Sequence, residues 1–313
     1  MITWTIGSGG LLGGALDRLR PHRFAAEAVP WDNPAAAAAV LTSDLARFVD
    51  EGAGEPWSIA WMAGSATVSS TPEQAAAEHD TLSALLQALR QRPPMGTGAF
   101  FLTSSAGGVY AGSAHPPFTD ATAPIAVSAY GALKLNQEQV AVTTLSDTCP
   151  VVIGRFSNIY GPGQNLQKLQ GLISRLAQAA ATQTPLNIFV SLDTLRDYIY
   201  VDDAAERAAF WLDEATTRQP SDAHTTVIAS GESVTVGQLI RTMHLVTKRR
   251  IPTALGSHAS ARDQVLDLRL VPTDAGALVG LPLTPLPAGA KRTYLDILER
   301  LQASDVTGST SPR

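Results

Sequence analysis

A tyrosine, a lysine and two serines in this chain have side chains and a spacing that suit proton transfer. Tyr130 stands four residues before Lys134 in a segment that predicts a helix over 128–146. Residues i and i+4 share one helix face, so Lys134 can hold its ammonium near the phenol. A unit charge about 4 Å away, at an effective dielectric near 20, is worth roughly 4 kcal/mol. A phenol so placed could act as a general acid or base at neutral pH.

The two serines end a predicted strand over 98–105. In doubly wound α/β proteins, ligands bind at the carboxyl ends of parallel strands, so a hydroxyl there can share a substrate oxygen with Tyr130. Ser105 is our first choice for this role and Ser104 the second. The alternatives are ordinary turn serines and an exposed amphipathic helix that carries Tyr130 and Lys134 by chance.

Strands and helices are predicted to alternate along most of the chain. Strands are expected over 2–6, 24–32, 57–64, 98–105, 150–156, 185–190 and 225–230, with helices between them. Asn33 is expected to cap the helix that begins at Pro34. The alternation predicts an α/β fold, a Rossmann-type doubly wound parallel sheet with a second, smaller C-terminal α/β substrate domain.

The expected domain division follows this alternation, which loosens toward the C-terminus. The dinucleotide-binding domain is expected over 1–161 and about 192–229, and the substrate domain over about 162–191 and 230–302. The polar segment 303–313 is expected to be a disordered tail.

Glycines follow the first predicted strand at Gly7, Gly10 and Gly13. They permit a tight turn, a close approach of backbone to a pyrophosphate and close helix packing, while the N–H groups of Leu11 and Leu12 open the helix toward an anion. Loop glycines without this function are the alternative. The position after the first strand favours dinucleotide binding.

A carboxylate at the end of the second predicted strand would bind the cofactor ribose, and Asp32 has this position. It would repel a 2′-phosphate and favour NAD. Asp32 could instead cap the next helix, and Arg20 and Arg23 leave NADP possible.

Composition excludes several classes of function. A net charge of −5 with 16% charged residues disfavours nucleic-acid binding. The single cysteine, Cys149, cannot form an internal disulfide, and six scattered histidines predict no metal site. We expect a cytosolic protein without a signal peptide or membrane span. The G-x-S-x-G elbow of hydrolases and the G-K-[ST] phosphate loop are both absent.

Seven segments occur in the order typical of one family: GSGGLLG, WMAGSATVSS, SSAGGVY, YGALK, GRFSNIYGPGQ, LRDYIYVDDAA and TTVIASGESVTVGQLI. Together they resemble the extended short-chain dehydrogenase/reductase family, in its NAD-dependent epimerase/dehydratase branch that acts on nucleotide sugars. The resemblance covers nearly the whole chain.

The resemblance implies a role for individual residues. Tyr130 would be the catalytic acid/base, Ser105 its hydroxyl partner, and Lys134 the residue that binds the nicotinamide ribose. The residues implied to line the cofactor are Ala63 and Gly64, and those implied to bind the nucleotide sugar are Asn158, Arg196 and Arg262. Surface ion pairs are the alternative for the two arginines. A homodimer through helices at 81–90 and 132–145 is also implied.

Three departures from the family pattern limit these expectations. The segment between Asp32 and Trp57 is too short for the family's additional strand, and Glu78, His79 and Asp80 stand where an asparagine commonly supports the site. Sugar dehydratases carry a Thr-Asp-Glu run at the serine site, whereas this chain has no carboxylate there. Dehydration is therefore disfavoured, and because Asp32 suggests NAD we expect a nucleotide-sugar 4-epimerase. An NAD(P)H-dependent keto-sugar reductase and a non-catalytic dinucleotide-binding regulator remain the alternatives.

Overall fold

The large sheet of the computed structural model is parallel and five-stranded. The structure describes residues 1–64, 66, 71–167, 171–256 and 265–308. The strands lie in the order β1-β2-β3-β4-β8 and span Ile2–Ile6, Trp57–Trp61, Gly98–Ser105, Val151–Phe156 and Ala223–Ile228. Parallel neighbours require crossover connections, which the intervening helices provide.

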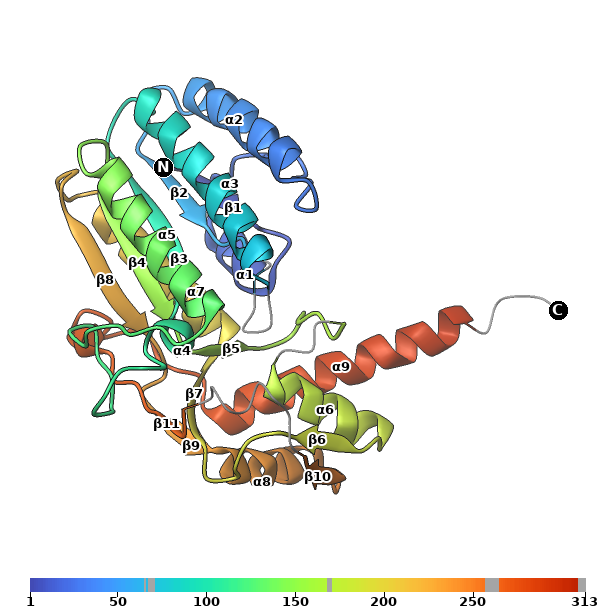
Figure 1. Cartoon of the computed structure of the whole chain (residues 1–313). Coiled ribbons are helices and arrows are strands. Elements are labelled where there is room, and N and C mark those ends of the chain that lie inside the picture. The colour runs from blue at the N-terminus through green and yellow to red at the C-terminus, as the bar shows by residue number, and fades with distance from the viewer. Residues whose placement is uncertain (65, 67–70, 168–170, 257–264, 309–313) are drawn as a thin grey trace.

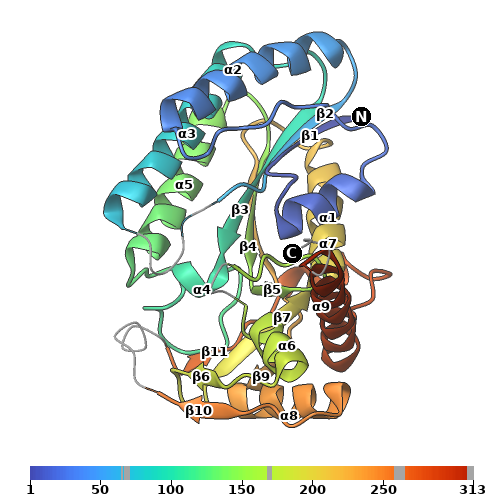
Figure 2. The same ribbon diagram turned by 90° about the vertical axis from the view of Figure 1, so that its right-hand side faces the viewer.

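Helices cover both faces of this sheet (Figures 1 and 2). The helices α2, α3 and α5 lie on one face and span Pro34–Glu51, Pro72–Gln91 and Ala129–Leu145. The other face is covered by α1 (Leu11–Leu19) and α7 (Val201–Ala215). Every residue of β1 and β2 is buried, as expected for strands with two covered faces. The doubly wound α/β fold predicted from the sequence is confirmed.

The strand predicted over 24–32 does not form. The segment meets β1 at its first residue, where Phe24 donates its N–H to the carbonyl of Thr3 at 2.9 Å beside an isolated bridge between Thr3 and Arg23. Beyond it, side chains of α2 satisfy the backbone: Asp44 accepts the N–H of Glu27 at 2.8 Å, and Arg47 donates to the carbonyl of Ala25 at 2.9 Å. The segment is therefore held by the helix rather than by strand pairing.

A smaller body packs below the carboxyl edge of the large sheet. It contains β5 (Asn158–Tyr160), β7 (Leu195–Tyr200), β9 (Ser233–Thr235) and β11 (Asp267–Leu268) in one sheet, with β6 (Leu186–Ile188) and β10 (Thr253–Leu255) in another. Its helices α6, α8 and α9 span Leu172–Thr182, Val236–Thr247 and Leu286–Gly308. These helices share one buried apolar cluster, and α9 projects outward from it (Figure 1).

Two boundaries differ from the expected division. Strand β7, expected in the dinucleotide-binding domain, pairs with β5, β9 and β11 of the smaller body. Helix α9 continues to Gly308, into the segment expected to be a disordered tail, because neither proline nor glycine interrupts the chain from 290 to 307. Within the described part of the chain, no helix has the length and apolar character needed to cross a membrane.

Candidate active site

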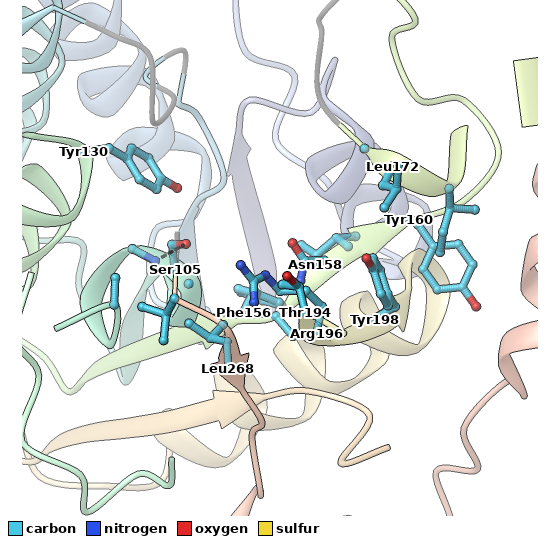
Figure 3. A pocket seen from close by; sticks show the side chains of 18 of the residues that line it. Ser105, Tyr130, Phe156, Asn158, Tyr160, Leu172, Thr194, Arg196, Tyr198 and Leu268 are labelled. Atoms are coloured by element: carbon cyan, nitrogen blue, oxygen red, sulfur yellow. Dashed lines mark hydrogen bonds between the residues drawn. The ribbon is translucent and has the colours of Figure 1, made fainter. Parts of the chain in front are cut away.

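A pocket of about 580 Å³ lies where the carboxyl ends of β3 and β4 meet the smaller body (Figure 3). Ser105, Tyr130 and Phe156 line it from the large sheet and its helices. Asn158, Thr194, Arg196 and Tyr198 line it from the smaller sheet and its loops. None of the described residues that line this pocket is an aspartate or a glutamate. The pocket therefore brings Tyr130 and Ser105 together with Asn158 and Arg196, and its described lining suits an anion.

The start of α5 and the end of β3 place Tyr130 and Ser105 on this pocket. Ser128 caps α5 by accepting the N–H of Gly131 at 3.1 Å, which fixes Tyr130 in the first turn. Ser105 accepts the N–H of Gly108 at 3.2 Å, and its own hydroxyl proton stays available to a ligand. Both side chains face the same space in Figure 3.

The other serine makes a different set of contacts. Ser104 is buried, and its Oγ donates to Oε1 of Glu138 at 2.5 Å. Arg155 binds the same carboxylate with Nη2 2.6 Å from Oε2, and it donates to the hydroxyl of Tyr110 at 2.9 Å. Glu138 keeps the Arg155 pKa above its usual range although burial acts to lower it. The geometry favours Ser105 over Ser104 as the serine that meets a substrate.

Lys134 is buried one helical turn after Tyr130, and its Nζ lies 5.8 Å from the centroid of the phenol ring. Nζ donates to Oε1 of Gln137 at 2.9 Å and to Oε1 of Glu78 at 3.2 Å. Burial acts to raise the pKa of Glu78, but the charge of Lys134 and the N–H of Ala66 outweigh it and hold the pKa below its usual value. Glu78 was noted from the sequence as a departure from the family pattern, but its contact with Lys134 was not predicted.

The glycine turn has the geometry of a phosphate cradle. Gly7 has φ +92°, and a β-carbon there would lie 2.7 Å from the backbone nitrogen of Ala63. A β-carbon on Gly13 would collide with the carbonyl of Gly7. Gly10 caps α1 without any side-chain hydrogen bond, so the N–H groups of Leu11 and Leu12 begin an uncapped helix. These residues fit a dinucleotide pyrophosphate.

Ala63 and Gly64 lie between this cradle and α5. They follow β2 after one residue, Met62, and the last residue of β2 pairs with the last residue of β1. A β-carbon on Gly64 would lie 3.7 Å from Nζ of Lys134. The two expected cofactor segments and the lysine therefore occupy one edge of the sheet.

Asp32 is exposed in the turn before α2. Asn33, as predicted, caps α2 by accepting the N–H of Ala36 at 3.1 Å, so Asp32 is not the capping residue. The ring of the neighbouring Trp31 packs edge-on against Trp61 at the carboxyl end of β2, with 6.0 Å between centroids. This contact holds the Asp32 turn at the cofactor edge of the sheet.

Arg20 and Arg23, which could have bound the 2′-phosphate of NADP, each form an ion pair with an aspartate. Arg20 is buried, and its Nη1 lies 2.6 Å from Asp213 of α7. Arg23 binds Asp17 with 3.3 Å between Nη1 and Oδ2. Each of these guanidinium groups therefore already has a carboxylate partner.

The expected substrate residues lie on the opposite wall. Asn158 donates Nδ2 to the carbonyl of Asp197 at 2.8 Å. Arg196 is partly buried with no ion pair to any described residue, and burial lowers its pKa. Arg262 lies outside the described residues. Sequence reasoning missed Arg175 of α6, a second arginine on the pocket without an ion pair in the described part of the chain; no motif marks it.

Comparison with known proteins agrees with this geometry. A family model described as the NAD dependent epimerase/dehydratase family matches residues 39–226. The chain belongs to this family. The motifs predicted this family, and NAD is the cofactor that its description names.

Two curated relatives are sugar-nucleotide enzymes. The chain is 26% identical over 178 residues to a dTDP-4-dehydro-6-deoxyglucose reductase of Escherichia coli. The aligned residues make up 55% of this chain and 54% of that protein. It is 30% identical over 128 residues to a dTDP-L-rhamnose 4-epimerase of Burkholderia thailandensis, over 40% of this chain and 34% of that protein. The chain thus spans about half or less of the length of these relatives.

Solved structures share the fold over nearly the whole chain. UDP-glucose 4-epimerase from Brucella ovis, in complex with NAD, has a TM-score of 0.78 at 18% identity, covering 95% of this chain and 98% of that one. UDP-glucose 4-epimerase from Thermotoga maritima, with UDP-glucose, has a TM-score of 0.77 at 19% identity, covering 96% and 100%. At these identities the likeness concerns the fold.

Proposed function

We propose that the protein is a nucleotide-sugar 4-epimerase that works by transient hydride transfer through a keto-sugar. The observation that carries this proposal is the shared pocket: Tyr130 and Ser105 face a space that also holds Arg196 and has no carboxylate among its described lining residues. An acid/base pair at one end, and at the other guanidinium groups that pair with no carboxylate of the described residues, suit a sugar attached to a diphosphate.

In this mechanism NAD, when bound, supplies the site that accepts and returns a hydride. Tyr130 takes the proton from the sugar hydroxyl that is oxidised and returns it when the keto group is reduced. Ser105 donates to the same sugar oxygen and holds it against the phenol. Lys134 favours the ionised phenol through its charge and has one N–H left for the cofactor ribose after its two side-chain contacts.

Arg196 and Arg175 are proposed to bind the diphosphate. Each lines the pocket without an ion pair to a described residue, so a substrate anion would complete their hydrogen bonds. Asn158 would orient the sugar diphosphate beside them. Replacing Arg196 with glutamine should raise KM for a nucleotide sugar about tenfold or more while NAD binding stays unchanged.

Elimination of water is disfavoured by the same lining. Dehydration needs an additional acid and base near the reacting carbons. The residues after Ser105 are Ala106, Gly107 and Gly108, and none can supply either.

The choice of NAD rests on two contacts. Asp32 lies in the turn at the cofactor edge and would repel a 2′-phosphate, and the pairing of Arg20 with Asp213 removes a cation that could bind one. Mass spectrometry of the ligand retained by purified protein, followed by turnover of a panel of UDP- and dTDP-sugars, tests the proposal. We expect bound NAD and interconversion of two 4-epimers without net consumption of cofactor.

A keto-sugar reductase is the second candidate, because one curated relative is a dTDP-4-dehydro-6-deoxyglucose reductase. The same Tyr130 would then protonate the sugar oxygen in one direction only. Protein that retains no nicotinamide and consumes NADH or NADPH in proportion to product would favour the reductase.

The cytosolic location predicted from the single cysteine stays a proposal.

A homodimer through α3 and α5 is also a proposal. The exposed outer residues of these helices are small or polar: Glu73, Gln74, Ala76, Asp80, Gln87, Arg90, Ala132, Asn136, Gln139 and Thr143. Such a face gives little apolar area to bury, so we expect a dimer whose population depends on concentration. Sedimentation equilibrium over a range of concentrations measures it.

A further inference from the structure

The buried ion pair between Glu78 and Lys134 lies directly behind the proposed catalytic tyrosine. The exposed fractions of the two side chains are 7% and 6%. Gln137 closes the group: its Nε2 donates to Oε1 of Glu78 at 3.2 Å, and its Oε1 accepts from Nζ of Lys134 at 2.9 Å. The ammonium is therefore held in one orientation by two neighbours.

The second carboxylate oxygen of Glu78 reaches the loop after β2. Oε2 accepts the N–H of Ala66 at 2.9 Å. A β-carbon on Gly64 would lie 3.4 Å from Oε1 of Glu78 and 3.7 Å from Nζ of Lys134. One side chain from α3 thus joins the loop expected to line the cofactor to the lysine of α5.

The charge of this carboxylate acts on the same phenol as the lysine. An ammonium in contact with a carboxylate has a smaller net effect on a nearby phenol than an ammonium alone. The other charged or titratable groups on the elements packed around Lys134 are Glu73, His79, Asp80 and Arg90 on α3, Tyr130 and Glu138 on α5, and Arg155 on β4, which pairs with Glu138.

We propose that Glu78 is the positioning residue of Lys134: its carboxylate fixes the ammonium and moderates its charge. Its consequence is that the phenol of Tyr130 meets a weaker positive field than an unpaired ammonium at Lys134 would produce. Any effect of Glu78 on catalysis rests on the proposed function. Its electrostatic effect on Tyr130 needs only the folded protein, without cofactor or substrate.

The test follows the ionisation of Tyr130 in the cofactor-free protein by the ultraviolet absorbance of its phenolate. The chain has six tyrosines, so each protein is compared with the same protein that also carries Tyr130→Phe. Glu78→Gln keeps the shape and removes the charge. Glu73→Gln makes the same chemical change at an exposed position in the first turn of α3 and is the matched control.

We expect the ionisation midpoint of Tyr130 in Glu78→Gln to fall by about half a pH unit or more, since the ammonium loses its counter-charge. The melting temperature should fall by about 5 °C at pH 7, because a buried ammonium is left unpaired. Glu73→Gln should match the unsubstituted protein in both. If Glu78→Gln does not fold, Gln137→Glu adds a carboxylate at the same ammonium and should raise the midpoint.

A midpoint that does not move in either variant would overturn the proposal, even if the melting temperature falls, because the role would then be structural only. The titration uses no sugar, so its outcome is separate from that of the proposed function. If the unsubstituted protein lacks epimerase activity but the Tyr130 midpoint shifts in Glu78→Gln, the proposed function is contradicted and the role of Glu78 is not. If the unsubstituted protein is active but the midpoint does not shift, only the role of Glu78 is contradicted.

Discussion

Gly108 lies against the ring of Tyr130. A β-carbon on Gly108 would be 3.0 Å from Cε1 and 3.1 Å from Cδ1 of that ring. The same glycine donates its N–H to Ser105, so one residue sets the spacing between the phenol and the hydroxyl. Because Gly108 has no side chain, the phenol ring can lie against the turn that carries Ser105.

Gly108→Ala should therefore impair chemistry more than folding. The ring must move by a few tenths of an ångström to admit the methyl group, and small misplacements of catalytic groups lower rates steeply. We expect kcat to fall about tenfold or more, measured by steady-state turnover. Gly237→Ala, where the new β-carbon would lie at an ordinary 3.4 Å from its nearest neighbour, is the control and should retain kcat.

Ser104 and Ser105 should separate stability from catalysis. Ser104→Ala removes a donor to the buried carboxylate of Glu138, so the free energy of unfolding should fall by about 1–3 kcal/mol with kcat little changed. Ser105→Ala should leave stability nearly intact and lower kcat roughly 100-fold, because a donor to the reacting oxygen is lost. Urea unfolding and turnover measure the two effects, and the reverse pattern would make Ser104 the catalytic serine.

Local signals predicted the parts of the fold that depend on short-range chemistry. The glycine turn, the Asn33 cap and the α5 face with Tyr130 and Lys134 all follow from spacing and residue type. The segment 24–32 has strand-like composition, but Asp44 and Arg47 of α2 bind its backbone groups. That competition is a tertiary contact, which a window of neighbouring residues does not contain.

The candidate site shows the same limit. Motifs marked Ser105, Tyr130 and Lys134, which the structure brings to one edge of the sheet. Arg175 lies in an amphipathic helix and reaches the pocket only because α6 packs there. Pairings such as Glu78 with Lys134, 56 positions apart, depend on how α3 and α5 pack together, so spacing along the chain could not reveal them.

His224 should make the protein less stable as the pH falls. Its ring lies 4.5 Å from that of Trp211, and burial lowers its pKa although Asp274 acts in the opposite direction. Because the folded pKa lies below that of the unfolded chain, about 6.5, the unfolded state takes up the proton first on acidification. The stabilisation is therefore present at neutral pH and is lost as pH falls through the unfolded value toward the folded one.

Thermal melts between pH 7.5 and pH 5 check this. His224→Asn should flatten the fall in melting temperature over this range, whereas His115→Asn, at an exposed position, should keep the slope of the original protein. Equal slopes in all three proteins would assign the acid sensitivity to other groups.

Reduction of bound NAD by a single addition of nucleotide sugar tests the role of Tyr130 most directly. The protein loaded with NAD should develop NADH fluorescence on mixing with a substrate sugar. Tyr130→Phe should bind NAD with unchanged affinity and form NADH about 10²–10⁴-fold more slowly, because the phenol can no longer take the proton. NADH formation in Tyr130→Phe at the original rate would contradict the account.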